Sequence, residues 1–194
     1  RRRRLRSAHK VGLYPSRLRE WRSQSGLAHF VPIHRKGETF MGKVKTTEEI
    51  KKMEEEIRQN IKEIESRQPD HLYQKLKMEF YEWDYEERSV TVRYPVLDWE
   101  LNHMKSMHGG IIASAIDTTS GITTSHFANH TITPTISINI NYLSPAMDGD
   151  AMLVKAKIDR MGKRLVNLTT NCYSENSGNV IATATVNFML VGKQ

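Results

Sequence analysis

The sequence has little cysteine: Cys172 is the only one among 194 residues. A single cysteine excludes an internal disulfide framework and fits a reducing compartment. We expect Cys172 to be a core residue, because no group of Cys and His has the spacing of a metal site. A glycine-rich phosphate loop and a dinucleotide fingerprint are also missing. The sequence therefore predicts neither a metal nor a cofactor.

Charge is scarce in the middle of the chain. From Ser106 to Met147 there are 42 residues, and Asp117 is the only Asp, Glu, Lys or Arg among them. The chain-wide charged fraction of 26% predicts about 11 such residues in a window of this length. A segment so poor in charge is predicted to be buried. The lone carboxylate of Asp117 needs a specific reason, because burying an unpaired charge is costly.

Long apolar runs are also missing. No stretch reads as a signal peptide or as a membrane span. The charge-poor stretch from Asn102 to Thr124 is long enough to suggest a span, but Asp117 and its many Thr and Ser argue against one. We therefore expect a cytoplasmic protein without a membrane partner.

Residues 1–40 differ in composition from the rest of the chain. They hold 9 Arg, 2 Lys and 2 Glu, a balance of +9, so the remainder of the +7 chain carries 7 − 9 = −2. One interpretation is a nucleic-acid-binding arm or an organelle transit segment. We favour the other, a disordered or non-native extension upstream of a natural start at Met41. On this reading the near-neutral remainder predicts no nucleic-acid partner.

Residues 41–75 are predicted to hold an amphipathic helix and a linker. Thr46 and Glu49 have the spacing of a capping box. Apolar residues follow at helical spacing, and Pro69 ends the pattern. These apolar residues are Ile50, Met53, Ile57, Ile61 and Ile64. One apolar stripe on a highly charged helix predicts packing on the body of the protein or on a partner subunit.

From Leu76 onward the apolar period changes to two, which is typical of strands. The predicted strands are 78–84, 89–94, 133–142, 151–159, 165–173 and 180–190. In the third of them, Ile136, Ile138, Ile140 and Tyr142 are expected on one face. The order is two strands, one helix and four strands, joined by tight turns. Residues 76–194 are therefore predicted to form one α+β domain, an antiparallel sheet of five to six strands around a central helix.

That central helix is predicted to start after Gly109-Gly110, a pair that suits a turn leading into a helix. From Ile111 to Thr123 the apolar residues occupy nearly all sides of the helix, which predicts burial. His108 and Asp117 are nine residues apart, about 13.5 Å of rise and two and a half turns. On one helix they would face opposite sides, so a site that uses both would lie between two subunits.

The chain resembles the hotdog-fold acyl-CoA thioesterases, in the group of the phenylacetate-pathway (PaaI-like) and thioesterase-superfamily proteins. The residues that carry the resemblance are Asn102, His108-Gly109-Gly110, Asp117, the strand end Tyr142-Leu143-Ser144-Pro145-Ala146 and the hairpin Gly162-Lys163-Arg164-Leu165. The resemblance covers roughly residues 78–190. It implies a sheet wrapped around one helix, with two subunits that join their sheets edge to edge. It also implies a homodimer or a homotetramer built as a dimer of dimers.

The resemblance assigns catalytic roles to six residues. Asp117 would be the general base or nucleophile, and Gly109 or Gly110 would donate a backbone N–H to the oxyanion. Asn102 would orient water or substrate, His108 would position the loop or the carbonyl, and Thr135 would help to hold the water. Each has a structural alternative. Asn102 could be a turn residue, His108 a loop cap, Asp117 a structural acid and Thr135 an ordinary strand residue.

The resemblance also implies two acyl-CoA-binding segments. They comprise Tyr142, Leu143, Ser144, Pro145, Ala146 and Met147, and Arg160, Met161, Gly162, Lys163, Arg164 and Leu165. Three cations of the second segment could meet the phosphates of CoA. Alternatively, the segment is a solvated hairpin tip. His103, His126 and His130 are interpreted as surface or loop histidines.

The leading functional hypothesis is hydrolysis of an acyl-CoA thioester to free acid and CoA. A non-catalytic acyl-CoA-binding or sensing protein on the same fold is the alternative. A hotdog dehydratase is a third, for which we expect His to be paired with an acid at another spacing. The fold alone does not separate these functions. The sequence does not define the acyl group.

Residues 1–40 are predicted to be dispensable. A chain that starts at Met41 should fold and turn over substrate like the full chain, because its composition is that of a whole domain. Thermal denaturation and turnover of both chains check this. Loss of either property in the shorter chain would contradict the prediction.

Overall fold

The structure, a computed structural model, describes residues 46–66 and 71–191. The chain divides into two units, Arg1–Glu38 and Thr39–Gln194, and the described residues all belong to the second. The predicted extension over 1–40 lies outside the described residues.

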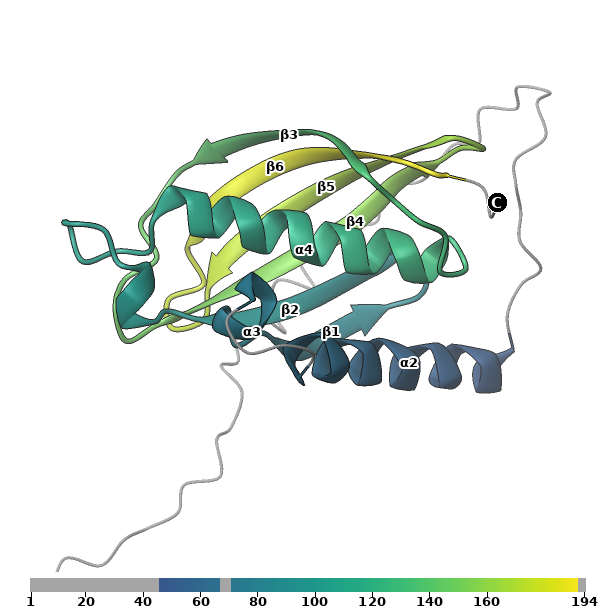
Figure 1. Cartoon of the computed structure of the whole chain (residues 1–194), viewed down its shortest axis with the longest axis horizontal. Coiled ribbons are helices and arrows are strands. Elements are labelled where there is room, and N and C mark those ends of the chain that lie inside the picture. The colour runs from purple at the N-terminus through teal and green to yellow at the C-terminus, as the bar shows by residue number, and fades with distance from the viewer. Residues whose placement is uncertain (1–45, 67–70, 192–194) are drawn as a thin grey trace, which may run out of the picture. The chain divides into compact units, whose positions relative to one another are not determined.

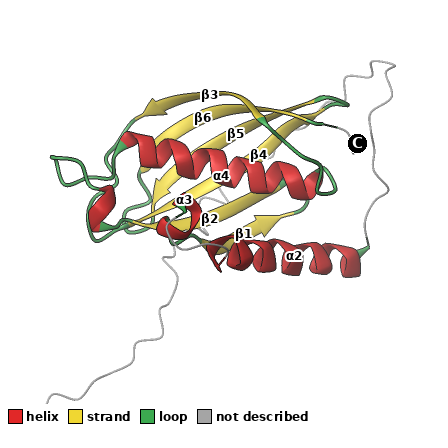
Figure 2. Cartoon of the chain, viewed as in Figure 1, coloured by secondary structure: helices red, strands yellow, loops and turns green. Residues whose placement is uncertain are grey.

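Six antiparallel strands form one sheet (Figures 1 and 2). Their bounds are β1 (Glu79–Asp84), β2 (Ser89–Pro95), β3 (Thr135–Tyr142), β4 (Ala151–Met161), β5 (Leu165–Ser174) and β6 (Val180–Met189). The order across the sheet is β1-β2-β4-β5-β6-β3, so β3 forms one edge beside the last strand of the chain. The predicted strands are confirmed to within a few residues.

The helix α4 (Gly109–Phe127) lies on one face of this sheet (Figure 1). Small residues such as Ala115 and Thr119 are fully buried and let the helix approach the strands closely. Two of its buried hydroxyls pair with hydroxyls of the strands: Thr119 Oγ1 is 2.9 Å from the hydroxyl oxygen of Tyr94 on β2. Ser120 Oγ is 2.9 Å from Thr170 Oγ1 on β5. These pairs remove the cost of burying hydroxyls and fix the helix against the strands.

Burial of α4 is one-sided, which differs from the prediction of a helix enclosed on all sides. Ile112 and Ile116 are buried against the sheet, whereas Ala113, Asp117 and Gly121 are only half-buried. A single sheet covers one side of a helix, so residues on the other side need a further layer to bury them. The apolar composition of α4 thus exceeds what one chain covers.

The amphipathic helix α2 (Thr47–Ser66) packs on the same core (Figure 1). The predicted capping box is present, with Thr46 N donating to Glu49 Oε2 at 2.7 Å and Glu49 N to Thr46 Oγ1 at 3.2 Å. Met53, Ile57 and Ile61 of the apolar stripe are buried.

Two contacts join α2 to β1. Trp83 Nε1 donates to Glu54 Oε2 at 3.0 Å, and the Arg58 guanidinium lies 3.8 Å from the centre of the Phe80 ring. The prediction that this helix packs on the body of the protein is confirmed.

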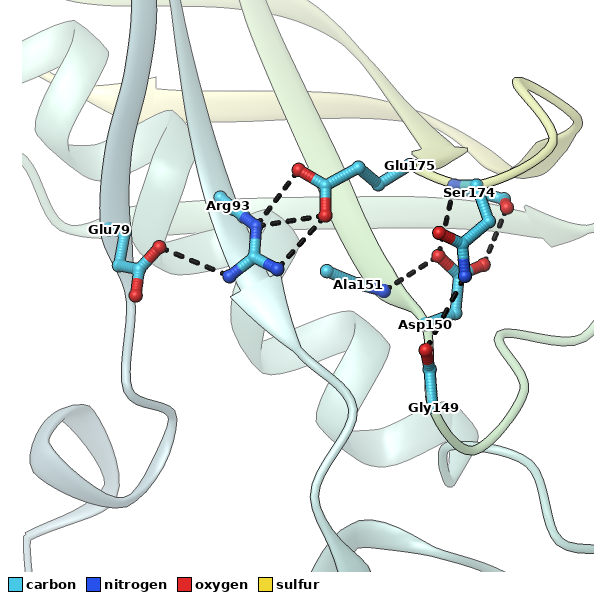
Figure 3. Close-up of polar contacts among 8 residues, drawn as sticks. Glu79, Arg93, Gly149, Asp150, Ala151, Ser174 and Glu175 are labelled. Carbon is cyan, nitrogen blue, oxygen red and sulfur yellow. Dashed lines mark hydrogen bonds and ion pairs between the residues drawn. The ribbon is translucent and has the colours of Figure 1, made fainter. Parts of the chain in front are cut away.

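An ion-pair network ties β1 and β2 to the turn after β5 (Figure 3). Arg93 on β2 donates to Glu175 at 2.9 Å and to Glu79 on β1 at 3.1 Å. Beside it, the Asp150 carboxylate accepts from the Ser174 hydroxyl and from the Ala151 amide. The network fixes the β5–β6 turn to the start of β4.

Two short helices were not predicted: α3 (Leu72–Lys75) and the 3₁₀ helix η1 (Asp98–Glu100). Both are too short to produce a helical period. Cys172 is buried, as predicted, and burial raises the pKa of its thiol to about 12. Within 46–66 and 71–191, the helices are too short or too polar to cross a membrane.

Ile57→Ala is predicted to lower the free energy of unfolding by about 2–5 kcal/mol, because it leaves a cavity between α2 and the core. Ile57 is fully buried, whereas Lys51 on the same helix is exposed. Urea unfolding of Ile57→Ala and of the control Lys51→Ala checks this. Equal stabilities of the two variants would show that α2 does not contribute to the core.

Candidate active site

Asp117 points from α4 toward the edge strand β3. Its Oδ1 accepts a hydrogen bond from Thr135 Oγ1 at 2.7 Å. The side chain is half-buried rather than enclosed, and its other oxygen has no partner in the described part of the chain. This carboxylate is oriented by one hydroxyl and keeps a free oxygen. A group in that state can accept a proton from a bound molecule.

A β-bulge in β3 places Thr135 opposite Asp117. The pairing of β3 with β6 runs Thr135↔Phe188 and then Ser137↔Asn187, so Ile136 is an extra residue. The bulge reverses the alternation, and Thr135 shares the helix-facing side with Ile138. The prediction that Ile136 lies on the face of Ile138 is therefore wrong; Ile136 is half exposed.

His108 is the N-cap of α4. Its Nδ1 accepts a hydrogen bond from Gly110 N at 3.0 Å. Of the two glycine N–H groups proposed as oxyanion donors, Gly110 is engaged. Gly109 N–H has no acceptor among the described residues, and it lies at the positive end of the α4 dipole. Gly109 is thus the donor available to an anionic oxygen.

The prediction that His108 and Asp117 face opposite sides of one helix does not hold. His108 has an extended backbone and precedes the helix, so helical rotation does not fix its direction. The groups are nevertheless separated along the axis of α4. Gly109 and Asp117 are eight residues apart within α4, about 12 Å of rise. The two groups do not meet in one chain.

Asn102 closes the turn before His108. Its Oδ1 accepts from Met104 N at 2.8 Å and from Ser106 N at 3.3 Å. Its Nδ2 donates to Ser106 Oγ at 3.0 Å. These bonds support the structural alternative for Asn102, a turn residue. They shape the loop that leads to Gly109.

The strand end after β3 packs on this loop. Tyr142 OH donates to Gly109 O at 2.9 Å, and Met107 N donates to Ala146 O at 2.8 Å. A Cβ at Gly109 would lie 3.4 Å from the Tyr142 ring, in van der Waals contact with it. The structure thus gathers residues 142–147 around Asn102, His108 and Gly109, and Tyr142 positions the helix start.

The second predicted binding segment lies at the other end of the sheet. Thr135 pairs with Phe188, Phe188 with Val166, and Val166 with Met161, the last residue of β4. Residues 160–165 therefore lie at the Thr135 end of β3, whereas residues 142–147 lie at the opposite end. The predicted site residues of one chain thus fall into two groups, at the two ends of β3. We call them the glycine half-site (102, 108–110 and 142–147) and the aspartate half-site (117, 135 and 160–165).

Two buried titratable residues escaped the sequence analysis. His126 is 5% exposed, which corrects its interpretation as a surface histidine. Its Nδ1 lies 2.9 Å from Ile122 O, and burial lowers the pKa of its imidazole. Glu100 is 2% exposed although it precedes the charge-poor window. Glu100 lies in a 3₁₀ helix of three residues, which is too short to show a period, so only the fold reveals its burial.

The described residues contain no group of three or more His, Cys, Asp or Glu that could hold a metal ion. In the part of the chain that the structure describes, Asp117 has only Thr135 as a partner, and His108 caps α4. A carboxylate and a helix N-terminal amide are the kinds of group that general-base and oxyanion chemistry use.

This chain is similar to known proteins in sequence and in fold. Residues 104–181 match the family model of the thioesterase superfamily. The resemblance to the hotdog-fold thioesterases is confirmed. The mouse acyl-coenzyme A thioesterase 13 is 27% identical over 81 residues, which make up 42% of this chain and 58% of that protein. The match thus spans less than two thirds of the relative.

Two solved structures share the hotdog fold. Zebrafish thioesterase superfamily member 2 has a TM-score of 0.62 at 20% identity, over 70% of this chain and 96% of that one. The protein smu.793 of Streptococcus mutans, bound to acetyl CoA, has a TM-score of 0.53 at 25% identity, over 59% of this chain and 90% of that one. The six-stranded sheet with its central helix is thus the hotdog fold.

His108→Ala is predicted to destabilise the hotdog domain by about 0.5–2 kcal/mol, because the first turn of α4 loses its cap. His108→Ser should recover most of the loss, since a hydroxyl can accept from the same turn. His103→Ala is the control, an exposed histidine of the preceding loop. Urea unfolding at pH 8 checks all three. Equal stabilities of His108→Ala and His103→Ala would contradict the capping role.

Proposed function

We propose that this protein hydrolyses acyl-CoA thioesters in a site that two copies of the chain share. The observation that carries the proposal is the placement of the half-sites. An oriented carboxylate, Asp117, and a free helix N-terminal amide, Gly109, lie at opposite ends of one edge strand. The mouse thioesterase and the acetyl-CoA-bound relative support acyl-CoA as the ligand.

Antiparallel pairing through β3 would join the half-sites. In such a pair, the Thr135 end of one β3 lies beside the Tyr142 end of the other. Asp117 and Thr135 of one copy would then approach Gly109 and His108 of its partner. The pairing would create two equivalent sites, because a twofold interface is used by both copies alike.

The exposed surface of β3 supports this pairing. As an edge strand it leaves main-chain groups unpaired, and Ile136 and Tyr142 on it are 50% and 52% exposed. The uncovered side of α4, with Ala113 and Gly121, faces the same edge as Asp117. A second copy would cover these groups. We propose a homodimer, and a dimer of dimers as the larger assembly.

The chemistry needs one base and one oxyanion donor. Asp117 would take a proton from water as the water oxygen attacks the thioester carbonyl carbon. The hydroxyl of Thr135 holds the carboxylate in place through Oδ1, which leaves Oδ2 for the water. Loss of such a base typically costs about 10²–10⁴ in rate.

The tetrahedral intermediate would place its negative oxygen at Gly109 N–H of the other copy. This donor is preorganised by the His108 cap and by the Tyr142 contact. Collapse of the intermediate breaks the C–S bond, and the proton held by Asp117 passes to the leaving thiolate. The products are a free acid and CoA, and no other reactant is required.

The cations of the hairpin would meet the phosphates of CoA. Arg160, Lys163 and Arg164 are exposed at the aspartate half-site. Gly162 N donates to Leu165 O at 2.8 Å and closes the hairpin turn. The solvated-tip interpretation predicts instead that removing these charges leaves the KM unchanged.

Release of CoA, followed with a thiol reagent across short, long and aryl acyl-CoAs, tests the function. We expect turnover by the wild type and a loss of about 10²–10⁴ in Asp117→Ala. Thr118→Ala, a half-buried neighbour on α4, is the matched control. Tight binding of acyl-CoA without release of CoA would favour the non-catalytic alternative.

Mixing of lesions tests the shared site. One chain carries Asp117→Ala, and a differently tagged chain carries His108→Ala with Asn102→Ala. In a purified mixed dimer both sets of lesions fall in one site, and the other site is intact. Activity should return to about half of the wild type if the two sites act independently. A mixed dimer as inactive as the single-lesion dimers would contradict the shared site.

A further inference from the structure

Glu100 is the one buried Asp, Glu, Lys or Arg of the described residues, at 2% exposure. It is the last residue of η1, directly before the turn that Asn102 closes. The catalytic scheme proposed above does not use it. A buried acid beside the glycine half-site therefore calls for a role.

The contacts of Glu100 run both to η1 and to the start of α4. Its Oε2 accepts from Leu97 N at 3.0 Å and so closes η1 on itself. Its main-chain oxygen accepts from His108 N at 2.8 Å. The conformation of Glu100 is thus connected by one hydrogen bond to the residue that precedes Gly109.

The second carboxyl oxygen is not satisfied. Oε1 is buried and has no hydrogen-bond partner among the described residues. An ionised carboxylate in that position would leave charge on an unsolvated oxygen, which is costly, whereas the neutral acid carries none. Burial raises the pKa of this carboxyl to about 7, and the Leu97 amide opposes the shift.

No charged neighbour accounts for the shift. Burial and the Leu97 amide are its causes, and no Coulombic contribution accompanies them. Asp98, His103, Lys105, His108 and Asp148 of the adjoining segments are exposed, and Asp150, whose main-chain oxygen accepts from Val96 N, is half-buried. The protonation state of Glu100 therefore depends on its own burial.

We propose that Glu100 is a positioning residue of the glycine half-site: its neutral acid holds η1 and, through its carbonyl, the backbone of His108 and Gly109. This rests on the proposed function in so far as Gly109 is the oxyanion donor. Ionisation draws the carboxyl toward water and strains η1, which loosens the segment 101–110. The Gly109 amide then loses its preset direction.

The sign of the linkage follows from the raised pKa. The unfolded chain ionises Glu100 near the ordinary value of 4.5, whereas the folded chain keeps the proton up to about pH 7. Stability that the neutral acid contributes is complete below pH 4.5 and is lost as the pH rises toward 7. Glu100→Gln keeps a neutral acceptor and donor of the same shape, so it lacks this dependence.

Hydrogen exchange at residues 101–110, between pH 5.5 and 8.5 and corrected for intrinsic rates, tests the proposal without substrate. In the wild type we expect protection of this segment to fall several-fold above about pH 7, with β5 as an internal reference. In Glu100→Gln protection should stay constant. The same fall in both proteins would overturn the proposal, and so would constant protection in the wild type, which decides the matter even if the variant fails to fold.

Activity supplies the second readout. The wild type should lose kcat above about pH 7 with little change in KM, and Glu100→Gln should retain kcat there. An alkaline loss of the same size in the variant would overturn the positioning role. Absence of CoA release by the wild type at every pH would refute the proposed hydrolysis instead, and hydrogen exchange would still decide the role of Glu100.

Discussion

The close approach of α4 to the sheet is the constraint on which the rest of the fold depends. Small side chains allow this approach, and Ala115, Thr119 and Ser120 are completely buried there. The hydroxyls of Thr119 and Ser120 can be buried because each has a hydrogen-bond partner, Tyr94 for Thr119 and Thr170 for Ser120. A helix so poor in intrinsic propensity is maintained by this packing. The same packing sets the direction of Asp117 and the position of Gly109.

A consequence concerns the groups that we propose to react. Asp117 and Gly109 occupy the side of α4 next to β3, and that edge lacks a neighbouring strand. The rigid part of the fold holds the groups, and the open edge leaves them accessible. Tyr142, His108 and Glu100 then refine the position of the loop that carries Gly109.

The sequence predicted the fold closely because periods of two and of 3.6 are local signals. It also drew attention to Asp117, since a lone acid in a charge-poor window is conspicuous, and the structure shows that Thr135 orients this carboxylate. The sequence did not predict features that depend on contacts between distant segments. In the sequence the apolar residues alternate without a break across Ile136, so nothing there indicates the bulge. The one-sided burial of α4 depends on how many chains surround the helix. The burial of Glu100 and His126 is likewise visible only once distant segments meet.

The bulge in β3 also determines which side of the strand each side chain faces. With one extra residue at position 136, Thr135 and Tyr142 face the same side of the strand although an odd number of positions separates them. Removal of that residue would leave a regular strand of ordinary stability in which one of the two side chains points away from α4. The count of residues in this strand, and not only their identity, is therefore under constraint. Variants of this segment should tolerate substitution more readily than insertion or deletion.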